Sequence, residues 1–405
     1  MSRCVSGRDD TICFQVRVEM RILSLNFLLF TMSGVWRPIE WTSKCSRRLY
    51  SMFTFSTLYL LHFSMLIQFM DIVLVVDNMD DFATTALFFL STVSAVCKAV
   101  TTVTRRSDII NLVKILQEEP CKPSNEDEIN IQRKYDVLIR SYSISYTRLA
   151  AFSATGAVIG EILAMLQGEL PYRGWVPYDI YTSLLLFLLT SLQEMLAVIF
   201  GTIVNVATET IVLGFCLQTC SQLEILKYRL QKEILKSNEK EETRENPLKS
   251  VSYKRNRLSK HIHYHLCIIR FAKLVNDVFN QVLFVQFFAS IFTLCTSTYY
   301  LSSHTTVEDF VKLVIYTFCM FVQIFVYCWA GNEVILKSVE LGEAVYEMDW
   351  ILLNINEQKD LLMIMKRSKR PIKFTSTFLV TLSLESYGNI LKASYSAFNV
   401  LQQRI

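Results

Sequence analysis

The stretch from Ile180 to Ala207 reads IYTSLLLFLLTSLQEMLAVIFGTIVNVA and carries a single charged residue, Glu194. A helix needs about 20 mainly apolar residues to cross the ~30 Å hydrocarbon core of a bilayer. This stretch is long enough and predicts a membrane-spanning helix. Six further stretches qualify, with approximate bounds 52–76, 82–102, 143–166, 276–298, 311–331 and 374–401. We therefore expect an all-α membrane protein with seven transmembrane helices.

The composition of the whole chain agrees with this class. Its 405 residues are 52% hydrophobic and only 19% charged, whereas soluble domains are about 25% charged. With 11 glycines and 7 prolines, a β-rich or disordered protein is not expected. The net charge of +4 is small and divided among loops, which excludes a nucleic-acid-binding protein.

The distribution of basic residues predicts the orientation in the membrane. Lysine and arginine are retained on the cytoplasmic side. The loops Asp77 to Asp81 and Tyr299 to Phe310 contain neither residue, whereas the stretch 208–275 is strongly basic. The amino-terminal segment carries Arg3, Arg8, Arg17, Arg21, Arg37, Lys44, Arg47 and Arg48. We expect a cytoplasmic amino terminus and an extracellular carboxyl terminus, the inverse of a G-protein-coupled receptor.

The segments outside the spans complete the predicted organisation. Apolar residues at helical spacing predict amphipathic helices at 209–235 and 340–365, which we expect to pack together. The predicted parts are a cytoplasmic amino-terminal segment with a short re-entrant helix (1–48), transmembrane helices 1–4 (49–207), a cytoplasmic extension and loop (208–275), transmembrane helices 5–6 (276–331), a cytoplasmic anchor helix (332–372) and a pore-lining seventh helix (373–405).

Polar residues recur along the seventh span at steps of three and four, which places them on one helix face. They are Glu385, Asn389, Lys392, Ser396, Asn399 and Gln403. Polar groups at membrane depth normally face a partner or a water-filled path. Two interpretations remain open: several copies of this helix surround a pore, or the face packs against the other helices of its own subunit.

A small-molecule cavity is predicted in the outer half of the membrane. Gly156 and Gly160 lie four residues apart, where missing side chains permit close helix packing or leave room for a ligand. At the same depth we expect Phe88, Phe89, Tyr181, Leu185, Tyr316 and Met320. This would be an apolar, aromatic pocket with few hydrogen-bonding groups. The alternative is that the glycines and aromatic residues belong to ordinary packed core.

Catalytic and metal-binding motifs do not appear in the sequence. It contains no glycine-rich phosphate loop, paired carboxylate site or nucleophile elbow. His261, His263 and His265 form the one metal-like cluster, and we interpret it as a solvated face. We expect neither an enzyme nor a bound metal or cofactor.

Several motifs, in order, resemble the insect odorant receptors over nearly the whole chain. Gly34-Val35-Trp36-Arg37-Pro38 resembles the segment before the first span, and the stretch from Pro171 to Asp179 resembles the second outer loop. Ala344-Val345-Tyr346 with Trp350 is similar to the helix before the last span. The most specific match joins Ser383-Leu384-Glu385 to the run from Ile390 to Leu401.

The resemblance implies a tetrameric, odorant-gated, non-selective cation channel of the plasma membrane of sensory neurons. It implies that the last helix lines the pore and that Val400 is the hydrophobic gate. The implied pore residues are Lys392, Ser396, Asn399, Val400, Gln403 and Arg404. Arg404 departs from the apolar residue of the shared co-receptor, and the fourth connection is shorter than the co-receptor's. The chain therefore resembles a ligand-tuning subunit whose partners are the co-receptor, a small volatile odorant and membrane lipid.

Two rival functions remain at this point. A gustatory receptor of the same superfamily would carry a terminal Thr-Tyr motif with glutamine seven residues after the threonine. Here Ser394-Tyr395 is followed by Gln402 at eight. A metabotropic seven-helix receptor would act without a pore of its own.

Overall fold

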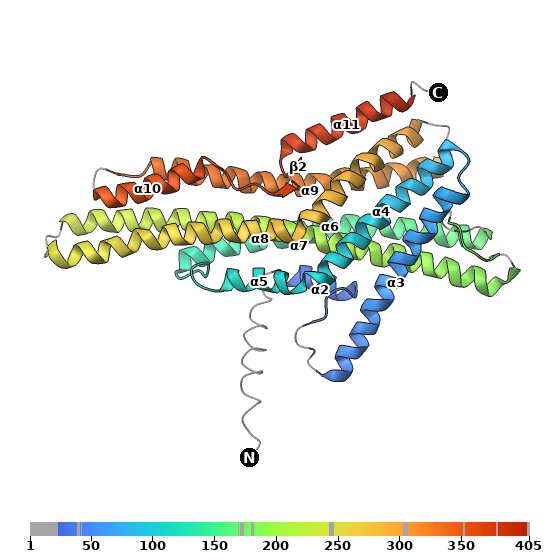
Figure 1. Cartoon of the computed structure of the whole chain (residues 1–405), viewed down its shortest axis with the longest axis horizontal. Helices are drawn as coiled ribbons and strands as arrows, with labels where there is room; N and C mark the ends of the chain where they lie inside the picture. The colour runs from blue at the N-terminus through green and yellow to red at the C-terminus, as the bar shows by residue number, and fades with distance from the viewer. Residues whose placement is uncertain are drawn as a thin grey trace, which may run out of the picture.

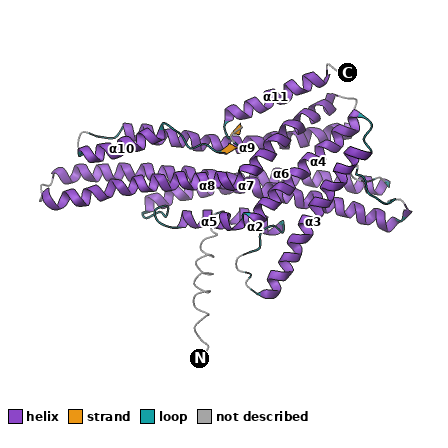
Figure 2. Ribbon diagram, viewed as in Figure 1, coloured by secondary structure: helices purple, strands orange, loops and turns teal. Residues whose placement is uncertain are grey.

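The computed structural model describes residues 23–38, 41, 43–168, 170, 174–179, 182–242, 247–302, 307–350, 353–377 and 380–402. Apart from one pair of short strands, the regular secondary structure of this part is helical (Figure 2). The helices are α2 (Ser24–Met32), α3 (Lys44–Leu74), α4 (Met79–Thr104), α5 (Arg106–Gln117), α6 (Glu126–Gln167), α7 (Leu184–Glu242), α8 (Pro247–Ser302), α9 (Val307–Tyr346), α10 (Ile355–Ser368) and α11 (Leu384–Gln402). The strands β1 (Thr375–Ser376) and β2 (Val380–Thr381) pair antiparallel.

Six helices in the described part are long and apolar enough to cross a membrane: α3, α4, α6, α7, α8 and α9. They correspond to the first six predicted spans, which confirms the all-α membrane class. Several of them continue far beyond the predicted bounds. Figure 1 shows α7 and α8 extending side by side along the longest axis of the molecule.

Helix α7 occupies the centre of the bundle. Every residue from Val206 to Leu223 is buried, and α2, α3, α4, α6, α8 and α9 all pack against α7. A helix that is covered on all sides needs partners for its polar residues as well as its apolar ones. Its outer turns differ, because Leu184, Leu185 and Leu189 are exposed where lipid can cover them.

The last helix begins ten residues later than the predicted span of 374–401. Residues 375–381 contain the strand pair β1–β2 in place of helix. The side-chain Oδ1 of Asn276 on α8 accepts a hydrogen bond of 2.7 Å from the backbone N–H of Thr375, which holds this segment extended. Helix α11 then starts after Ser383, whose Oγ accepts from the backbone N–H of Ser386 as an N-cap.

The two predicted cytoplasmic helices have different outcomes. The continuation of the fourth span over 209–235 is confirmed as part of α7. The predicted helix 340–365 is wrong, because the chain breaks between Tyr346 and Ile355. A capping box between Asn354 and Glu357 starts α10 as a separate helix. The expected packing is present between α7 and α9, where Lys227 Nζ lies 2.8 Å from Glu340 Oε1.

Candidate functional site

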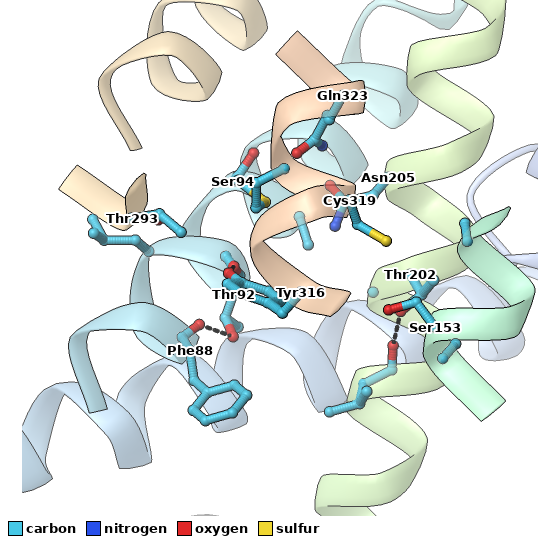
Figure 3. A pocket seen from close by; sticks show the side chains of 18 of the residues that line it. Phe88, Thr92, Ser94, Ser153, Thr202, Asn205, Thr293, Tyr316, Cys319 and Gln323 are labelled. Carbon is cyan, nitrogen blue, oxygen red and sulfur yellow. Dashed lines mark hydrogen bonds between the residues drawn. The ribbon is translucent and has the colours of Figure 1, made fainter. Parts of the chain in front are cut away.

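An inner cavity of about 220 Å³ lies among α3, α4, α6, α7, α8 and α9. Three of the residues predicted to bind a ligand line it: Phe88, Tyr316 and Met320. Figure 3 shows the side chains around this pocket, with Phe88 and Thr92 from α4, Thr202 and Asn205 from α7, and Tyr316 and Gln323 from α9. The cavity thus gathers residues that are far apart in the sequence.

The lining of the inner cavity is more polar than predicted. Its wall includes Ser94, Tyr146, Asn205, Gln286 and Gln323, besides several serines and threonines. This cavity therefore has more hydrogen-bonding groups than the apolar, aromatic pocket expected from the sequence. These polar residues lie on five different helices, so only the packing of those helices brings them together.

A buried ion pair anchors these polar groups. Lys98 Nζ on α4 lies 2.6 Å from Glu209 Oε1 on α7, and both side chains are almost completely inaccessible. Lys98 Nζ also donates to Asn205 Oδ1 at 2.8 Å. The Tyr146 hydroxyl donates to Glu209 Oε2, and the Gln323 amide donates to Glu209 Oε1. The carboxylate thereby links α4, α6, α7 and α9.

Gln286 extends the network to α8. Its Oε1 accepts from Ser94 Oγ at 2.8 Å and lies 3.5 Å from Gln323 Nε2. Its Nε2 donates to Ser290 Oγ at 3.0 Å. Five helices therefore meet in one hydrogen-bonded network, which we call the polar floor of the inner cavity: Ser94, Lys98, Tyr146, Asn205, Glu209, Gln286, Ser290 and Gln323.

A larger outer cavity of about 610 Å³ adjoins the inner one between α4, α6 and α9. Gly156 and Gly160 line it together with Phe88 and Tyr316, which also line the inner cavity. A Cβ added at Gly156 would meet no heavy atom within 4 Å, so this glycine leaves open space and does not serve close packing. Tyr316 is held in the shared wall by a 2.6 Å hydrogen bond between its hydroxyl and Ser91 Oγ.

The remaining predicted ligand residues have other surroundings. The ring of Phe89 lies 6.0 Å from the ring of Phe69 on α3, and Leu185 is 66% exposed on the outer turns of α7. Among the described lining residues of the two cavities, neither Phe89 nor Leu185 appears. Tyr181 lies outside the described residues.

The polar face of α11 points away from the rest of the chain. Glu385, Asn389, Lys392 and Ser396 are exposed, and Asn399 is half-buried. The opposite face packs on α8 and α9, with Ile390 and Ser394 buried. Figure 1 shows α11 at the edge of the bundle. Of the other predicted pore residues, the side chain of Val400 and all of Gln403 and Arg404 lie outside the described part.

The histidine cluster of α8 also departs from its predicted environment. His263 is exposed, but His265 is only 4% exposed, so a solvated face is wrong for His265. Burial, with a smaller contribution from the positive charge of Arg367 on α10, lowers the pKa of His265 to about 4. This side chain is therefore neutral at physiological pH.

Known proteins with similar sequences are odorant receptors. A model of the 7tm Odorant receptor family matches residues 78–395. Odorant receptor 46a, isoform B, of Drosophila melanogaster is 24% identical over 391 residues, which cover 92% of this chain and 96% of that protein. For two other receptors of this fly, the match spans less of each chain. Putative odorant receptor 85d is 28% identical over 35% of this chain and 34% of its own length. Odorant receptor 13a is 27% identical over 57% of this chain and 57% of its own length.

The fold is similar to that of a solved insect olfactory receptor, OR5 of Machilis hrabei. The TM-score is 0.80 for one structure of OR5 and 0.79 for its complex with eugenol, at 15% sequence identity. The aligned regions cover 97% and 96% of this chain and 100% of OR5. The match of the family over residues 78–395, together with this fold, shows that the chain belongs to the insect odorant receptors, a family of multi-pass membrane receptors and not of enzymes.

Proposed function

We propose that this chain is the ligand-tuning subunit of an odorant-gated, non-selective cation channel. In this proposal it assembles with the odorant receptor co-receptor, as a heterotetramer, in the plasma membrane of a sensory neuron. A small volatile odorant binds in the inner cavity. Because the ligand prefers the open arrangement of the helices, binding shifts the last helices outward and widens the constriction at Val400.

The observation that carries the proposal is the exposed polar face of α11. Charged and amide groups at membrane depth are expensive next to lipid. Here Asn389, Lys392 and Ser396 are exposed on the side that the chain itself does not cover. Several subunits around a symmetry axis would bring such faces together along a water-filled path. This arrangement favours the pore over packing within one subunit.

The orientation follows from the basic residues. With a cytoplasmic amino terminus, the segments 1–48, 208–275 and 332–372 lie in the cytoplasm and α11 ends outside the cell. An epitope tag at the carboxyl terminus should bind antibody on intact cells, whereas a tag at the amino terminus should do so only after permeabilisation. The reverse labelling would contradict this topology and, with it, the predicted outer position of the cavities.

The pore is tested by reversing a charge on α11. In cells that express the co-receptor as well, Lys392→Glu should raise the single-channel conductance for cations, because it replaces a repelling charge by an attracting one. A unit charge about 8 Å from an ion contributes about 0.5 kcal/mol in water, so the two-unit change favours local cations up to about fivefold. Patch-clamp recording during odorant application measures the effect.

Lys366→Glu is the matched control, because Lys366 is also exposed and lies on α10, away from the proposed pore. Its conductance should equal that of the wild type. Unchanged conductance in Lys392→Glu, with normal odorant response, would remove this residue from the pore. Absence of any odorant-evoked current from correctly inserted receptors would contradict the channel itself.

A further inference from the structure

The polar floor of the inner cavity contains two amides whose orientations are fixed by charge. Lys98 can only donate hydrogen bonds, so the side-chain oxygen of Asn205 must face it, as observed at 2.8 Å. Glu209, as a carboxylate, can only accept, so the side-chain nitrogen of Gln323 must face it. The ion pair therefore determines which end of each amide is left over.

The unused ends of the two amides are one hydrogen-bond donor and one acceptor. The Nδ2 of Asn205 and the Oε1 of Gln323 take no part in the hydrogen bonds of the polar floor. Both residues line the inner cavity and are labelled in Figure 3. A group that both accepts and donates one hydrogen bond is complementary to such a pair.

Among the other described polar side chains that line the cavity, Gln68 also has an unpaired oxygen, Oε1, whereas several hydroxyl groups already have partners. Thr202 Oγ1 donates to the backbone oxygen of Val198 at 2.9 Å, and Thr92 Oγ1 donates to that of Phe88 at the same distance. Ser94 bonds to Gln286, and Ser91 bonds to Tyr316. Thr92, Ser94 and Thr202 have used their hydroxyl hydrogens and can only accept a further bond, whereas the two amides together offer a donor and an acceptor.

We propose that the inner cavity selects small odorants that carry a hydroxyl group, with Nδ2 of Asn205 donating to the hydroxyl oxygen and the hydroxyl donating to Oε1 of Gln323. The inference rests on the proposed function, since it specifies the ligand class of the same pocket. The size also fits: an apolar cavity of about 150 Å³ binds benzene, so about 220 Å³ holds a ring or short chain with a small substituent.

Three probes of nearly equal size test this pairing: benzyl alcohol donates and accepts, anisole only accepts, and ethylbenzene does neither. Affinities are measured as thermal stabilisation of the purified complex with the co-receptor, and as the concentration for half-maximal current. Asn205→Leu should lower the affinity for benzyl alcohol and for anisole, relative to ethylbenzene, by roughly fivefold each. Gln323→Met should lower it for benzyl alcohol only, by a similar factor.

For each variant, the affinities for benzyl alcohol and anisole are expressed as ratios to the affinity for ethylbenzene. Comparing these ratios between variants cancels the different hydration of the probes and any general loss of stability. Thr202→Val is the control in the same wall, because the Thr202 hydroxyl already bonds within α7; its ratios should match the wild type. Unchanged ratios in both amide variants would overturn the hydroxyl preference while leaving the receptor function intact. Binding of the probes without current would contradict the channel but not the preference, and failure of all three to bind would overturn the preference.

Discussion

Two ion pairs on α7, one fully buried and one partly exposed, join the helices in different ways. Glu209 and Arg229 lie on the same helix, ~30 Å apart along its axis. Among the described residues, the partners of Glu209 are side chains from α4, α6 and α9, and its network borders a cavity. Arg229 pairs with Glu128 at 2.8 Å and also donates to the backbone oxygens of Pro120 and Lys122.

The partners of Arg229 hold one fixed geometry, whereas those of Glu209 surround a cavity. The Arg229 guanidinium also stacks on the ring of Tyr264, with 4.7 Å between the carbon of the guanidinium and the ring centroid. Backbone partners and a stacked ring leave it one geometry, so it fixes the turn before α6 against α7 and α8. The network around Glu209 borders a cavity, so under the proposed function it is this network that a ligand would contact.

The largest effect is expected from breaking the ion pair of Lys98 and Glu209. Lys98→Met leaves the Glu209 carboxylate buried without its countercharge, which typically destabilises a fold by about 3–5 kcal/mol. We expect loss of cell-surface expression and a strongly lowered melting temperature of the solubilised protein. Lys98→Met combined with Glu209→Gln should recover most of the loss, because it removes the uncompensated charge. Normal stability of the single variant would refute a charged pair at this site.

A smaller effect is expected at the ion pair of Arg229 and Glu128. Arg229→Met removes the hydrogen bonds to Glu128 and to two carbonyl groups. Each hydrogen bond to a charged group contributes about 1.5–3 kcal/mol to the free energy of unfolding, and water replaces part of this contribution. Because Arg229 is 15% exposed, we expect a net loss of roughly 2 kcal/mol, measured by thermal unfolding. Arg229→Lys should recover only part, since lysine cannot reproduce the planar fork. Lys114→Met, at an exposed pair, should change little.

Mild acid should lower the stability of the fold through His265 on α8. Its pKa is lowered from 6.5 to about 4 by burial and by Arg367. The unfolded chain therefore binds a proton that the folded chain resists, and stability falls as the pH drops from 6.5 toward 4. At pH 5.5 the loss is roughly 1 kcal/mol. His265→Gln should flatten this part of the stability profile.

The exposed His263 provides the control, since His263→Gln should leave the pH profile unchanged. The profile should also persist in the Lys98→Met and Glu209→Gln double variant, because the two sites lie in different parts of the bundle. If the acid loss disappeared in that variant, His265 and the Lys98–Glu209 pair could not be treated as independent.

Local patterns predicted much of the architecture. Runs of apolar residues identified six spanning helices, and steps of three and four placed Asn389, Lys392 and Ser396 on one exposed face of α11. The start of α11 was not predictable in this way, because an amide on α8, that of Asn276, holds the β1 segment extended. The break before α10 had a local signal, the capping box of Asn354 and Glu357, and could have been found from the sequence.

The sequence by itself determined the class of the protein, because hydrophobic length and helical periodicity are properties of neighbouring residues. It also placed Phe88, Tyr316 and Met320 near a pocket, through the depth of each residue in its span. Only the tertiary structure decided the polarity of that pocket. Lys98, Glu209 and Gln323 lie on three different helices, and nothing in their own segments specifies that a lysine, a carboxylate and an amide meet. Their hydrogen bonds arise from helix packing, and these bonds determine which end of each amide is engaged.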